Sequence, residues 1–370
     1  MIKMNKGWKK PKIEHGKMTE HNYIVQYPEN LQIGKNIDIG EFTYINAQFG
    51  IKIGNDVQIG SHCSIYSHST IDDKKGNIIL EKNCKIFGLK RWNLSRLRNV
   101  RHILDKIEWI DCDITDNISV KKALEIANPD KIFHLAAESF VSTSWNHPSH
   151  YIDVNYKGTV NILESMKDLK LNANILIPGS GEEYGKIHEN ELPITEETIL
   201  RPVNPYAVTK IAQDLIAYVY YETYGVNVIR VRAFNHEGPR RDNVFGIPSF
   251  CHQIAKIEKN LQDPILKTGH IEDKRNFTHV RDMVEAYWIA IEKCTPGELY
   301  LIGSDEADQI FTYRQIVEKL IAMSENKGIK IEEEPNFVRP TSVPRLIGDT
   351  SKFRNATGWK PKISIDDILQ

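Results

Sequence analysis

Short apolar strands alternate with helical patterns through the middle of the chain. Strand-like runs cover residues 107–110, 131–137, 174–178 and 226–231, and helical spacing covers residues 120–127, 156–166 and 206–221. Such an alternation indicates a parallel sheet that is covered by helices on both faces. We therefore expect an α/β fold for residues 87–370.

A different pattern precedes this region. Ile33, Ile39 and Ile45 lie six residues apart, glycine follows the first two, and the step resumes after a two-residue insertion. A six-residue apolar period is typical of a parallel β-helix, in which each repeat forms one strand and turn. At about 18 residues per coil, about three coils fit into residues 31–86. We expect a short left-handed β-helix there, after an N-terminal extension at residues 1–30.

Composition excludes several classes of protein. Lysine and arginine total 48 against 49 acidic residues, so no broad basic surface favours nucleic acid. No apolar run approaches the roughly 20 residues that cross a bilayer, and no apolar stretch follows the basic first residues. The five scattered cysteines suggest neither a disulfide framework nor a metal site. We expect a cytoplasmic protein without a membrane, nucleic-acid or metal partner.

Tyr206 and Lys210 are the strongest candidates for chemistry. They lie four residues apart, on one helix face, after Asn204 and Pro205, which suit a helix cap and a first helical position. A lysine cation stabilises a nearby phenolate and lowers its pKa. Such a tyrosine exchanges a proton with a sugar hydroxyl during hydride transfer. The alternative is an ordinary amphipathic helix that begins Tyr-x-x-x-Lys.

The same helix carries apolar residues at spacings of three and four. This pattern predicts that they are buried. They are Val208, Ile211, Ala212, Leu215, Ile216 and Val219.

Seven motifs follow one another in order. They are Asp111-Cys-Asp-Ile-Thr-Asp, His134-Leu-Ala-Ala-Glu-Ser, Gly179-Ser-Gly-Glu-Glu-Tyr-Gly, Pro205-Tyr-Ala-Val-Thr-Lys, Arg232-Ala-Phe-Asn-His-Glu-Gly-Pro-Arg-Arg, Arg275-Asn-Phe-Thr-His-Val-Arg-Asp and Arg339-Pro-Thr-Ser-Val-Pro-Arg. Together they resemble the extended short-chain dehydrogenase/reductases that act on nucleotide sugars, and GDP-mannose 4,6-dehydratase above all. The resemblance implies a Rossmann-like sheet, with the cofactor part mainly in residues 87–237 and a smaller C-terminal α+β substrate part mainly in residues 238–370.

The resemblance also implies catalytic roles. Ser180 matches the residue that hydrogen-bonds the sugar 4-oxygen, and Tyr206 removes the O4 proton with Lys210 beside it, while C4 hydride moves to NADP. Glu182 matches the acid/base that takes the C5 proton and assists loss of water from C6, before hydride returns to C6. The product is a 4-keto-6-deoxy sugar. A GDP-4-keto-6-deoxymannose reductase needs only the other three residues, and related epimerases also carry a glutamate there, so both remain alternatives.

Cofactor contacts are implied at several places. The matching positions are Lys90, Arg91, Asp113, Ile114, Ala136, Ala137, Tyr206 and Lys210. Asp113 and Ile114 fall where the family holds adenine, and the two alanines leave room for the dinucleotide. A basic pair at Lys90 and Arg91 favours the 2′-phosphate of NADP, although NAD remains possible. The alternative for this pair is two solvated cations.

Arginine and asparagine positions match the family's substrate contacts. They are Asn235, Arg240, Arg241, Arg275 and Arg339, and the planar fork of arginine suits phosphate. The implied partner is a nucleotide-diphosphate sugar, GDP-mannose in the first place. A homo-oligomer is also expected, through the tyrosine-bearing helices or the β-helix.

One family feature is missing. The family opens with a strand, a Gly-x-x-Gly-x-x-Gly loop and a helix that together hold the cofactor pyrophosphate, and this chain contains no such loop. A hexapeptide segment stands in place of the first strand, with a join near residues 84–88. Three hypotheses follow: a dehydratase whose cradle is rebuilt by the N-terminal part or a partner, a fusion that has lost cofactor binding, or a hexapeptide acyltransferase or assembly module. In the last case His62 or His68 is the candidate base.

Overall fold

The structure is a computed structural model that describes residues 9–35, 37–39, 41–54, 57–59, 64–66, 78–80, 85–92 and 97–370. His62 and His68 lie outside these ranges. The chain divides into two compact units, Met1–Phe87 with Ile103–Glu108, and Gly88–His102 with Trp109–Gln370. Within the described ranges, no helix has the length and apolar character that a membrane span requires.

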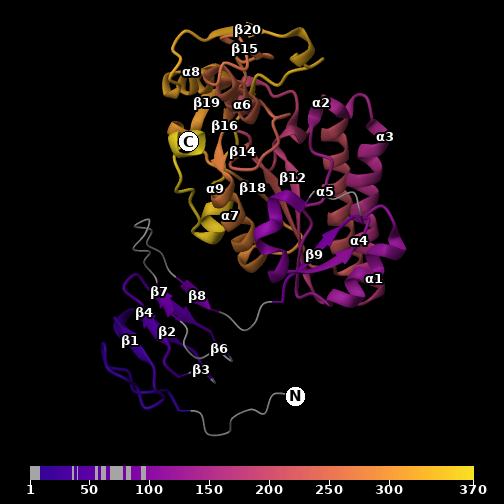
Figure 1. The fold of residues 1–370 in the computed structure, drawn as a ribbon. Helices are drawn as coiled ribbons and strands as arrows, with labels where there is room; N and C mark the ends of the chain where they lie inside the picture. The colour runs from indigo at the N-terminus through magenta and orange to yellow at the C-terminus, as the bar shows by residue number, and fades with distance from the viewer. Residues whose placement is uncertain are drawn as a thin grey trace. The chain divides into compact units, whose positions relative to one another are not determined.

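The first unit is built from very short strands. They are β1 (Ile24–Gln26), β2 (Leu31–Ile33), β3 (Asp38–Ile39), β4 (Tyr44–Asn46), β5 (Ile51–Ile53), β6 (Gln58–Ile59), β7 (Ser64–Tyr66) and β8 (Ile78–Leu80), with the 3-10 turn η1 (Pro28–Asn30). They pair in parallel in the orders β1-β4-β7, β2-β5-β8 and β3-β6 (Figure 1). Val25, Ile45 and Ile53 are almost fully buried between them.

The spacing of these strands differs from the expected 18 residues per coil. Ile24 pairs with Tyr44 and Leu31 pairs with Ile51, 20 residues apart in both cases, whereas Ile51 pairs with Ile78, 27 residues apart. For the pair Leu31 and Ile51, the two-residue insertion in the repeat adds to three six-residue steps. The stacked strands also begin with β1, before Leu31, so the preceding segment contributes a layer of its own.

From β9 onward, strands and helices alternate. Apart from Phe87 and Ile103–Glu108, these elements belong to the second unit. The first of them are β9 (Phe87–Lys90), η2 (Leu97–Lys106), β10 (Glu108–Asp111), α1 (Asn117–Ala127), β11 (Lys131–Phe133), α2 (Val141–Ser144), α3 (Pro148–Tyr151), the π-helix η3 (Ile152–Lys157), α4 (Gly158–Asp168), β12 (Asn174–Ser180), η4 (Gly181–Tyr184), η5 (Glu189–Glu191), α5 (Pro205–Tyr224) and β13 (Val228–Ala233). The predicted strands and helices are all present, with ends that shift by a few residues.

The second half completes the sheet and adds a smaller α+β part. It contains β14 (His236–Glu237), α6 (Gly246–Glu258), β15 (Ile265–Thr268), β16 (Lys274–Asn276), β17 (Thr278–His279), α7 (Val280–Lys293), β18 (Leu299–Ile302), η6 (Ala307–Gln309), β19 (Ile310–Thr312), α8 (Tyr313–Met323), β20 (Lys330–Glu333), η7 (Pro335–Phe337), β21 (Arg345–Leu346), α9 (Ser351–Thr357) and α10 (Ile365–Leu369). Helices α6, α8 and α10 share one apolar cluster that includes Phe250, Phe277 and Ile316.

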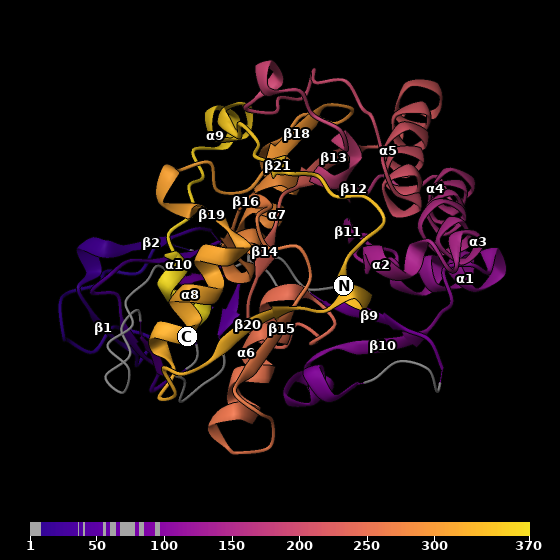
Figure 2. The same cartoon turned by 90° about the horizontal axis from the view of Figure 1, so that it is seen from above.

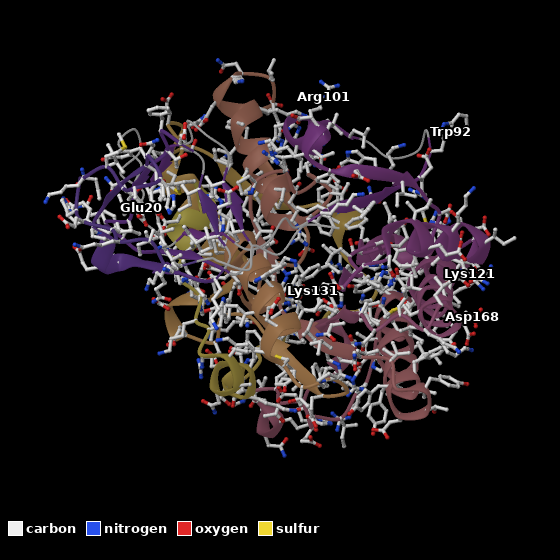
Figure 3. All side chains as sticks on the ribbon, turned by 90° about the horizontal axis from the view of Figure 1, so that it is seen from below. Glu20, Trp92, Arg101, Lys121, Lys131 and Asp168 are labelled. Atoms are coloured by element: carbon white, nitrogen blue, oxygen red, sulfur yellow. The ribbon has the colours of Figure 1, made fainter. Side chains whose placement is uncertain are left out.

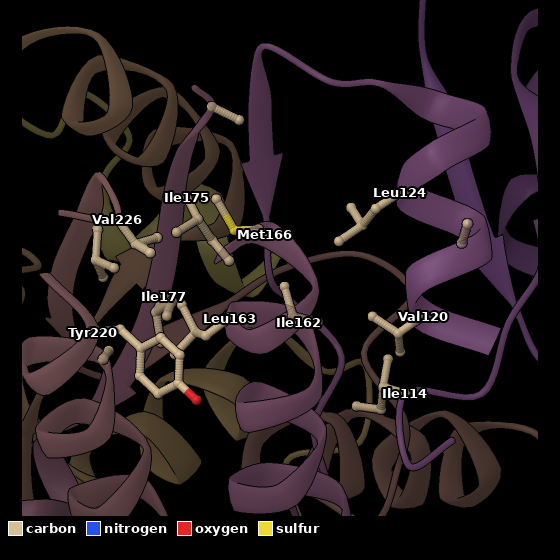
Figure 4. Close-up of a cluster of buried hydrophobic side chains, with 14 of the residues drawn as sticks. Ile114, Val120, Leu124, Ile162, Leu163, Met166, Ile175, Ile177, Tyr220 and Val226 are labelled. Atoms are coloured by element: carbon tan, nitrogen blue, oxygen red, sulfur yellow. The ribbon is translucent and has the colours of Figure 1, made fainter. Parts of the chain in front are cut away.

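The main sheet has the parallel order β11-β12-β13-β18. Successive strand residues face opposite sides. Ile175 and Ile177 therefore join the cluster beneath α1, α4 and α5 (Figure 4), whereas Leu176 packs with the residues of α7 and α9 on the other face. This arrangement confirms the predicted α/β fold with a parallel sheet covered on both faces.

Strands β9 and β10 form a separate two-stranded sheet, and both are visible in Figure 2. Strand β11 pairs with β12 along one edge, and its other edge has no strand partner in the described part of the chain. On the outer surface, Lys121 of α1 and Asp168 of α4 form an exposed ion pair of 3.3 Å (Figure 3). Such a pair contributes little to stability.

Helix α5 buries a different face from the one predicted. Its buried residues are Tyr206, Ala207, Thr209, Lys210, Gln213, Asp214, Ala217 and Tyr220. Val208, Leu215 and Val219 are 53%, 51% and 45% exposed. The prediction from apolar spacing was wrong because hydrogen bonds and ion pairs satisfy the polar side chains against the sheet, which makes their burial possible.

Candidate active site

Ser180 stands where strand β12 ends and the turn η4 begins. Its hydroxyl oxygen accepts a hydrogen bond from the Glu182 backbone N–H at 3.2 Å, and its own N–H donates to Glu183 Oε1 at 2.7 Å. This reciprocal pattern is a capping box, which holds the turn rigidly. Ser180 is thereby placed at the carboxyl end of a central parallel strand, where α/β folds bind ligands.

Tyr206 and Lys210 are brought to the same place by helix α5. Asn204 caps the helix, because its Oδ1 accepts from the Ala207 N–H at 2.7 Å, and Pro205 is the first helical residue. Both Tyr206 and Lys210 are buried, and the Ser180 side chain hydrogen-bonds with Tyr206. The structure therefore gathers three of the four predicted catalytic residues at one point.

The expected lowering of the tyrosine pKa is not found. Burial raises the pKa of Tyr206, the hydrogen bond from Ser180 lowers it, and the negative charges of Glu183 and Glu182 raise it further. The Lys210 ammonium donates its hydrogen bonds to the Pro178 carbonyl and to Gln213 Oε1. The prediction was wrong for this state because the lysine is engaged by the sheet and its own helix.

Lys210 itself is perturbed by its surroundings. Burial lowers its pKa to about 8, while the Glu183 and Asp214 carboxylates act in the opposite direction. Its partner Gln213 donates from Nε2 to Thr159 Oγ1 at 2.7 Å. Sequence reasoning missed Gln213, which sits three residues after the lysine on the same helix face.

Thr159 links this group to strand β11. Its hydroxyl donates to the Asn155 carbonyl at 2.7 Å, accepts from Gln213 Nε2, and hydrogen-bonds with His134 Nε2 at 2.8 Å. Burial and then Lys210 lower the His134 pKa to about 3, which keeps this imidazole neutral.

Glu182 and Glu183 point in different directions. Asn204 Nδ2 donates to Glu182 Oε2 at 3.1 Å, and Arg339 Nη1 lies 3.9 Å from Glu182 Oε1. Glu182 is half-buried, whereas Glu183 is fully buried against Arg232. Glu182 is therefore the more exposed of the two carboxylates, and its partners are Asn204 at the start of α5 and Arg339. Asn204 is a further site residue, found in the sequence only as a helix cap.

Several predicted substrate residues gather around Tyr313. Asn235 Nδ2 donates to its hydroxyl at 3.4 Å. Burial raises the pKa of Tyr313, while the charges of Arg275, Arg339 and Arg241 act to lower it. Two of these guanidinium groups already have close carboxylate partners, since Arg275 pairs with Asp273 at 3.3 Å and Arg241 with Glu237 at 3.1 Å, whereas Arg339, among the described residues, makes only the 3.9 Å approach to Glu182. The planar fork of arginine suits a diphosphate.

Arg240 does not share this location. Its Nη1 donates to the Asn99 carbonyl at 2.9 Å and approaches His102 Nε2 at 3.5 Å, both on η2. Its neighbour Arg241 instead pairs with Glu237 Oε1 at 3.1 Å. The two consecutive arginines that the sequence treats as a pair therefore separate.

Two predicted cofactor residues near the start of the second unit interact with carboxylates of the protein itself. Lys90 forms an ion pair with Asp111, and Arg91 lies close enough to Asp113 to lower its pKa. The largest cause of that lowered pKa is the hydrogen bond from the Thr115 N–H, at 2.9 Å. The lysine is thus already neutralised across the β9–β10 pair.

The remaining cofactor candidates are one buried residue and two small residues near the end of β11. Ile114 is buried against Gly158, where an added Cβ would lie 2.7 Å from Ile114 Cδ1. Ala136 is exposed and Ala137 half-buried, three and four residues after the end of β11. Within the described ranges, no three His, Cys, Asp or Glu side chains are grouped to hold a metal ion.

Known proteins resemble the chain over most of its length. The sequence model of the family described as GDP-mannose 4,6 dehydratase matches residues 58–370. The GDP-6-deoxy-D-mannose reductase of Pseudomonas aeruginosa is 33% identical over 242 residues, which cover 65% of this chain and 78% of that protein. GDP-mannose 4,6 dehydratase 1 of Arabidopsis thaliana is 28% identical over 307 residues, which cover 79% of this chain and 82% of that protein.

Solved structures share the fold. RMD from Pseudomonas aeruginosa complexed with NADPH superposes with a TM-score of 0.67 at 28% identity, over 77% of this chain and 96% of that chain. The dTDP-glucose 4,6-dehydratase of Bacillus anthracis in complex with NAD gives 0.66 at 26% identity, over 77% and 86%. The shared parallel sheet, the ordered motifs and a family match that spans well over half of the sequence agree, and the chain belongs to the GDP-mannose 4,6-dehydratase family.

Proposed function

We propose that this protein is a nucleotide-sugar 4,6-dehydratase that converts GDP-mannose to GDP-4-keto-6-deoxymannose with NADP. The observation that carries the proposal is the position of Glu182. Its carboxylate accepts a hydrogen bond from Asn204 Nδ2 at 3.1 Å, lies 3.9 Å from Arg339 Nη1 and is near enough to Tyr206 to raise the pKa of that phenol. Elimination of water needs a carboxylate in addition to the tyrosine couple, because a second proton must leave the sugar carbon.

Each side chain has a task that follows from its position. Ser180 donates to the sugar 4-oxygen, and the Tyr206 hydroxyl exchanges the O4 proton. Glu182 takes the C5 proton and delivers a proton to the departing C6 oxygen. Bound NADP supplies a hydride acceptor and donor, and Lys210, buried beside Pro178, holds positive charge near the tyrosine. The arginines around Tyr313 bind the diphosphate.

The residues present fit NADP at one end of the dinucleotide. Ser180, Tyr206 and Lys210 would hold the nicotinamide end, and the small side chains of Ala136 and Ala137 would let the dinucleotide lie close to the backbone. At the pyrophosphate end, the described residues contain no glycine-rich loop and helix beside the open edge of β11. This supports the inference that the Rossmann-like sheet lacks its usual first strand.

The domain boundaries belong to the same proposal. We assign the extension to residues 1–30, a left-handed β-helix to residues 31–86 and the dehydratase-like domain to residues 87–370. The 20-residue register of the short parallel strands supports the β-helix. The full chain is the material for any test, because residues 87–370 alone lack a complete cofactor cradle.

NADPH binding is tested first, and conversion of GDP-mannose is tested second. Purified full-length chain is titrated with NADPH by fluorescence, and GDP-mannose is then added and the product analysed. Saturable NADPH binding followed by a 4-keto-6-deoxy product is expected. Absence of any NADP(H) binding would contradict the proposal and favour a fusion that has lost the activity.

A reductase is the second candidate, because the Pseudomonas aeruginosa relative carries that name. That reaction uses Ser180, Tyr206 and Lys210 and gives the carboxylate no proton to remove. The two candidates separate when the chain is offered GDP-4-keto-6-deoxymannose with NADPH. Consumption of NADPH there, without turnover of GDP-mannose, would assign the reductase.

Substrate affinity should depend on Arg339 and much less on Arg240. Arg339→Ala removes a charge beside Glu182 and Tyr313, and the loss of a charge-assisted contact of about 1.5–3 kcal/mol weakens GDP-mannose binding by about 10- to 100-fold. Arg240→Ala is the matched control, since its guanidinium contacts Asn99. Calorimetric titration measures both. Equal losses in the two variants would contradict the assignment.

The exposed stripe of α5 supports the expected homo-oligomer. Val208, Leu215 and Val219 lie on one side of the helix. A second copy of this chain that covers the stripe would bury its apolar surface. Light scattering should then show a dimer that Leu215→Glu converts to a monomer. The control Leu261→Glu changes another exposed leucine outside α5, and dissociation in both variants, or in neither, would contradict this interface.

A further inference from the structure

A buried ion network lies directly behind the candidate catalytic residues. Glu183, which is not exposed at all, accepts a hydrogen bond from the Ser180 N–H through Oε1. Its Oε2 lies 2.7 Å from Arg232 Nε, as an ion pair whose geometry is not that of an aligned hydrogen bond. An added Cβ on Gly179 would come within 2.3 Å of Glu183 Oε1, so only glycine leaves room for this carboxylate.

Arg232 connects that turn to helix α5. Its Nη2 donates to Asp214 Oδ2 at 2.6 Å, and its Nη1 donates to the Tyr184 hydroxyl at 3.0 Å. Asp214 lies four residues after Lys210 and therefore one helical turn away on the same face. One guanidinium thus joins the strand end that carries Ser180 to the helix that carries Lys210.

The charges in this buried region balance. Two acidic side chains, Glu183 and Asp214, face two basic ones, Arg232 and Lys210, and all four are at least 95% buried. Burial raises the pKa of Glu183 to about 7, and the Arg232 guanidinium opposes that shift. Arg230, at the rim, approaches the other Asp214 oxygen at 3.5 Å. Because an uncompensated buried charge is costly, each ammonium or guanidinium depends on the carboxylates.

The same carboxylates act on the Lys210 charge. Burial lowers the Lys210 pKa, and Glu183 and then Asp214 oppose that shift. His134 also interacts with Lys210, and it is neutral because burial lowers its pKa to about 3. Tyr206 lies one helical turn from Lys210, and burial raises the pKa of its phenol, so neither group supplies a negative charge. The two carboxylates are therefore the groups that stabilise the ammonium form.

We propose that Glu183 and Asp214, joined by Arg232, are positioning residues that hold Ser180 in place and keep Lys210 protonated at working pH. The inference rests on the proposed function for the catalytic roles of Ser180 and Lys210. The effect of the two carboxylates on the Lys210 charge can be measured without turnover. Glu183 directly follows Glu182 in the sequence, but its side chain is buried and acts on the site through Ser180 and Arg232.

The test measures Lys210 directly. Side-chain nitrogen resonances of ¹⁵N-lysine-labelled full-length chain are titrated with pH, and Lys210→Arg identifies the signal. Glu183→Gln and Asp214→Asn keep the side-chain shape and remove one charge each. In each variant the midpoint of Lys210 should fall by about one pH unit or more. Glu191→Gln is the control, because it removes a carboxylate from a different arginine pair, with Arg201.

The pH dependence of turnover gives the second readout. A neutral Lys210 supplies no positive charge near Tyr206. The alkaline limb of the kcat profile should therefore move to lower pH in both variants, by as many pH units as the Lys210 midpoint. An unchanged Lys210 midpoint in Glu183→Gln and Asp214→Asn, with reduced thermal stability alone, would overturn the inference. A shifted midpoint in a chain that turns over no GDP-mannose would instead contradict the proposed function. Two variants are used so that misfolding of one leaves the other decisive.

Discussion

Tyr206→Phe is expected to lower turnover of GDP-mannose by about 10²–10⁴-fold, the usual contribution of a general acid–base group. The phenol is the group that Ser180 hydrogen-bonds in the first turn of α5, and it is the group to which the proposed function assigns exchange of the O4 proton. The fold should persist, because the ring keeps its edge contact with Tyr151, at 6.3 Å between centroids. Turnover is measured together with NADPH affinity, which should change little.

The control for this variant is Tyr218→Phe. Tyr218 belongs to the same helix, but it is exposed and its hydroxyl interacts with Glu222. Loss of that hydroxyl should leave turnover unchanged. A Tyr206→Phe protein that turns over substrate at the normal rate would remove Tyr206 from the chemistry, whatever its NADPH affinity.

Glu182→Gln should separate the two halves of the reaction. The amide still accepts a hydrogen bond from Asn204 but cannot take the C5 proton. Formation of the 4-keto-6-deoxy product should therefore fall by about 10²–10⁴-fold, while oxidation at C4 continues. Reduced nicotinamide is then expected to accumulate to about one equivalent per site on addition of GDP-mannose, because the intermediate does not proceed.

Its control is Glu189→Gln, which removes an exposed carboxylate that pairs with Arg345 on the surface. That change should leave both product formation and the nicotinamide signal unaffected. Normal dehydration by Glu182→Gln would assign the acid/base role to another group. Together with the Tyr206 variant, the experiment distinguishes loss of the first proton transfer from loss of the second.

Local features of the site were predictable from the sequence. The strand and helix alternation, the Asn204 cap and the Tyr206-to-Lys210 spacing depend on residues that are neighbours along the chain. The structure places α5 at Pro205–Tyr224, against a predicted helix at 206–221. The motif order also carried the family assignment, which the comparison over residues 58–370 confirms.

Partners that are distant along the chain were not predictable. Lys90 and Arg240 matched family positions, yet Lys90 pairs with Asp111 and Arg240 contacts Asn99. Both are long cationic side chains whose targets depend on which segment the fold brings alongside. A sequence pattern shows the charge but not its partner, so it does not separate a ligand contact from an ion pair.

The sequence alone determined that this chain forms a parallel α/β sheet with a tyrosine and a lysine on one helix face, after a run of six-residue repeats. Period and spacing are properties of the backbone, which is why they can be read without coordinates. Only the tertiary structure decided that α5 buries its polar face and exposes Val208 and Leu215, and that Glu183 turns inward to Arg232. Those outcomes depend on charges contributed by strand β13, more than 40 residues from Glu183 along the chain, because a buried carboxylate is stable only where the fold brings a cation to it.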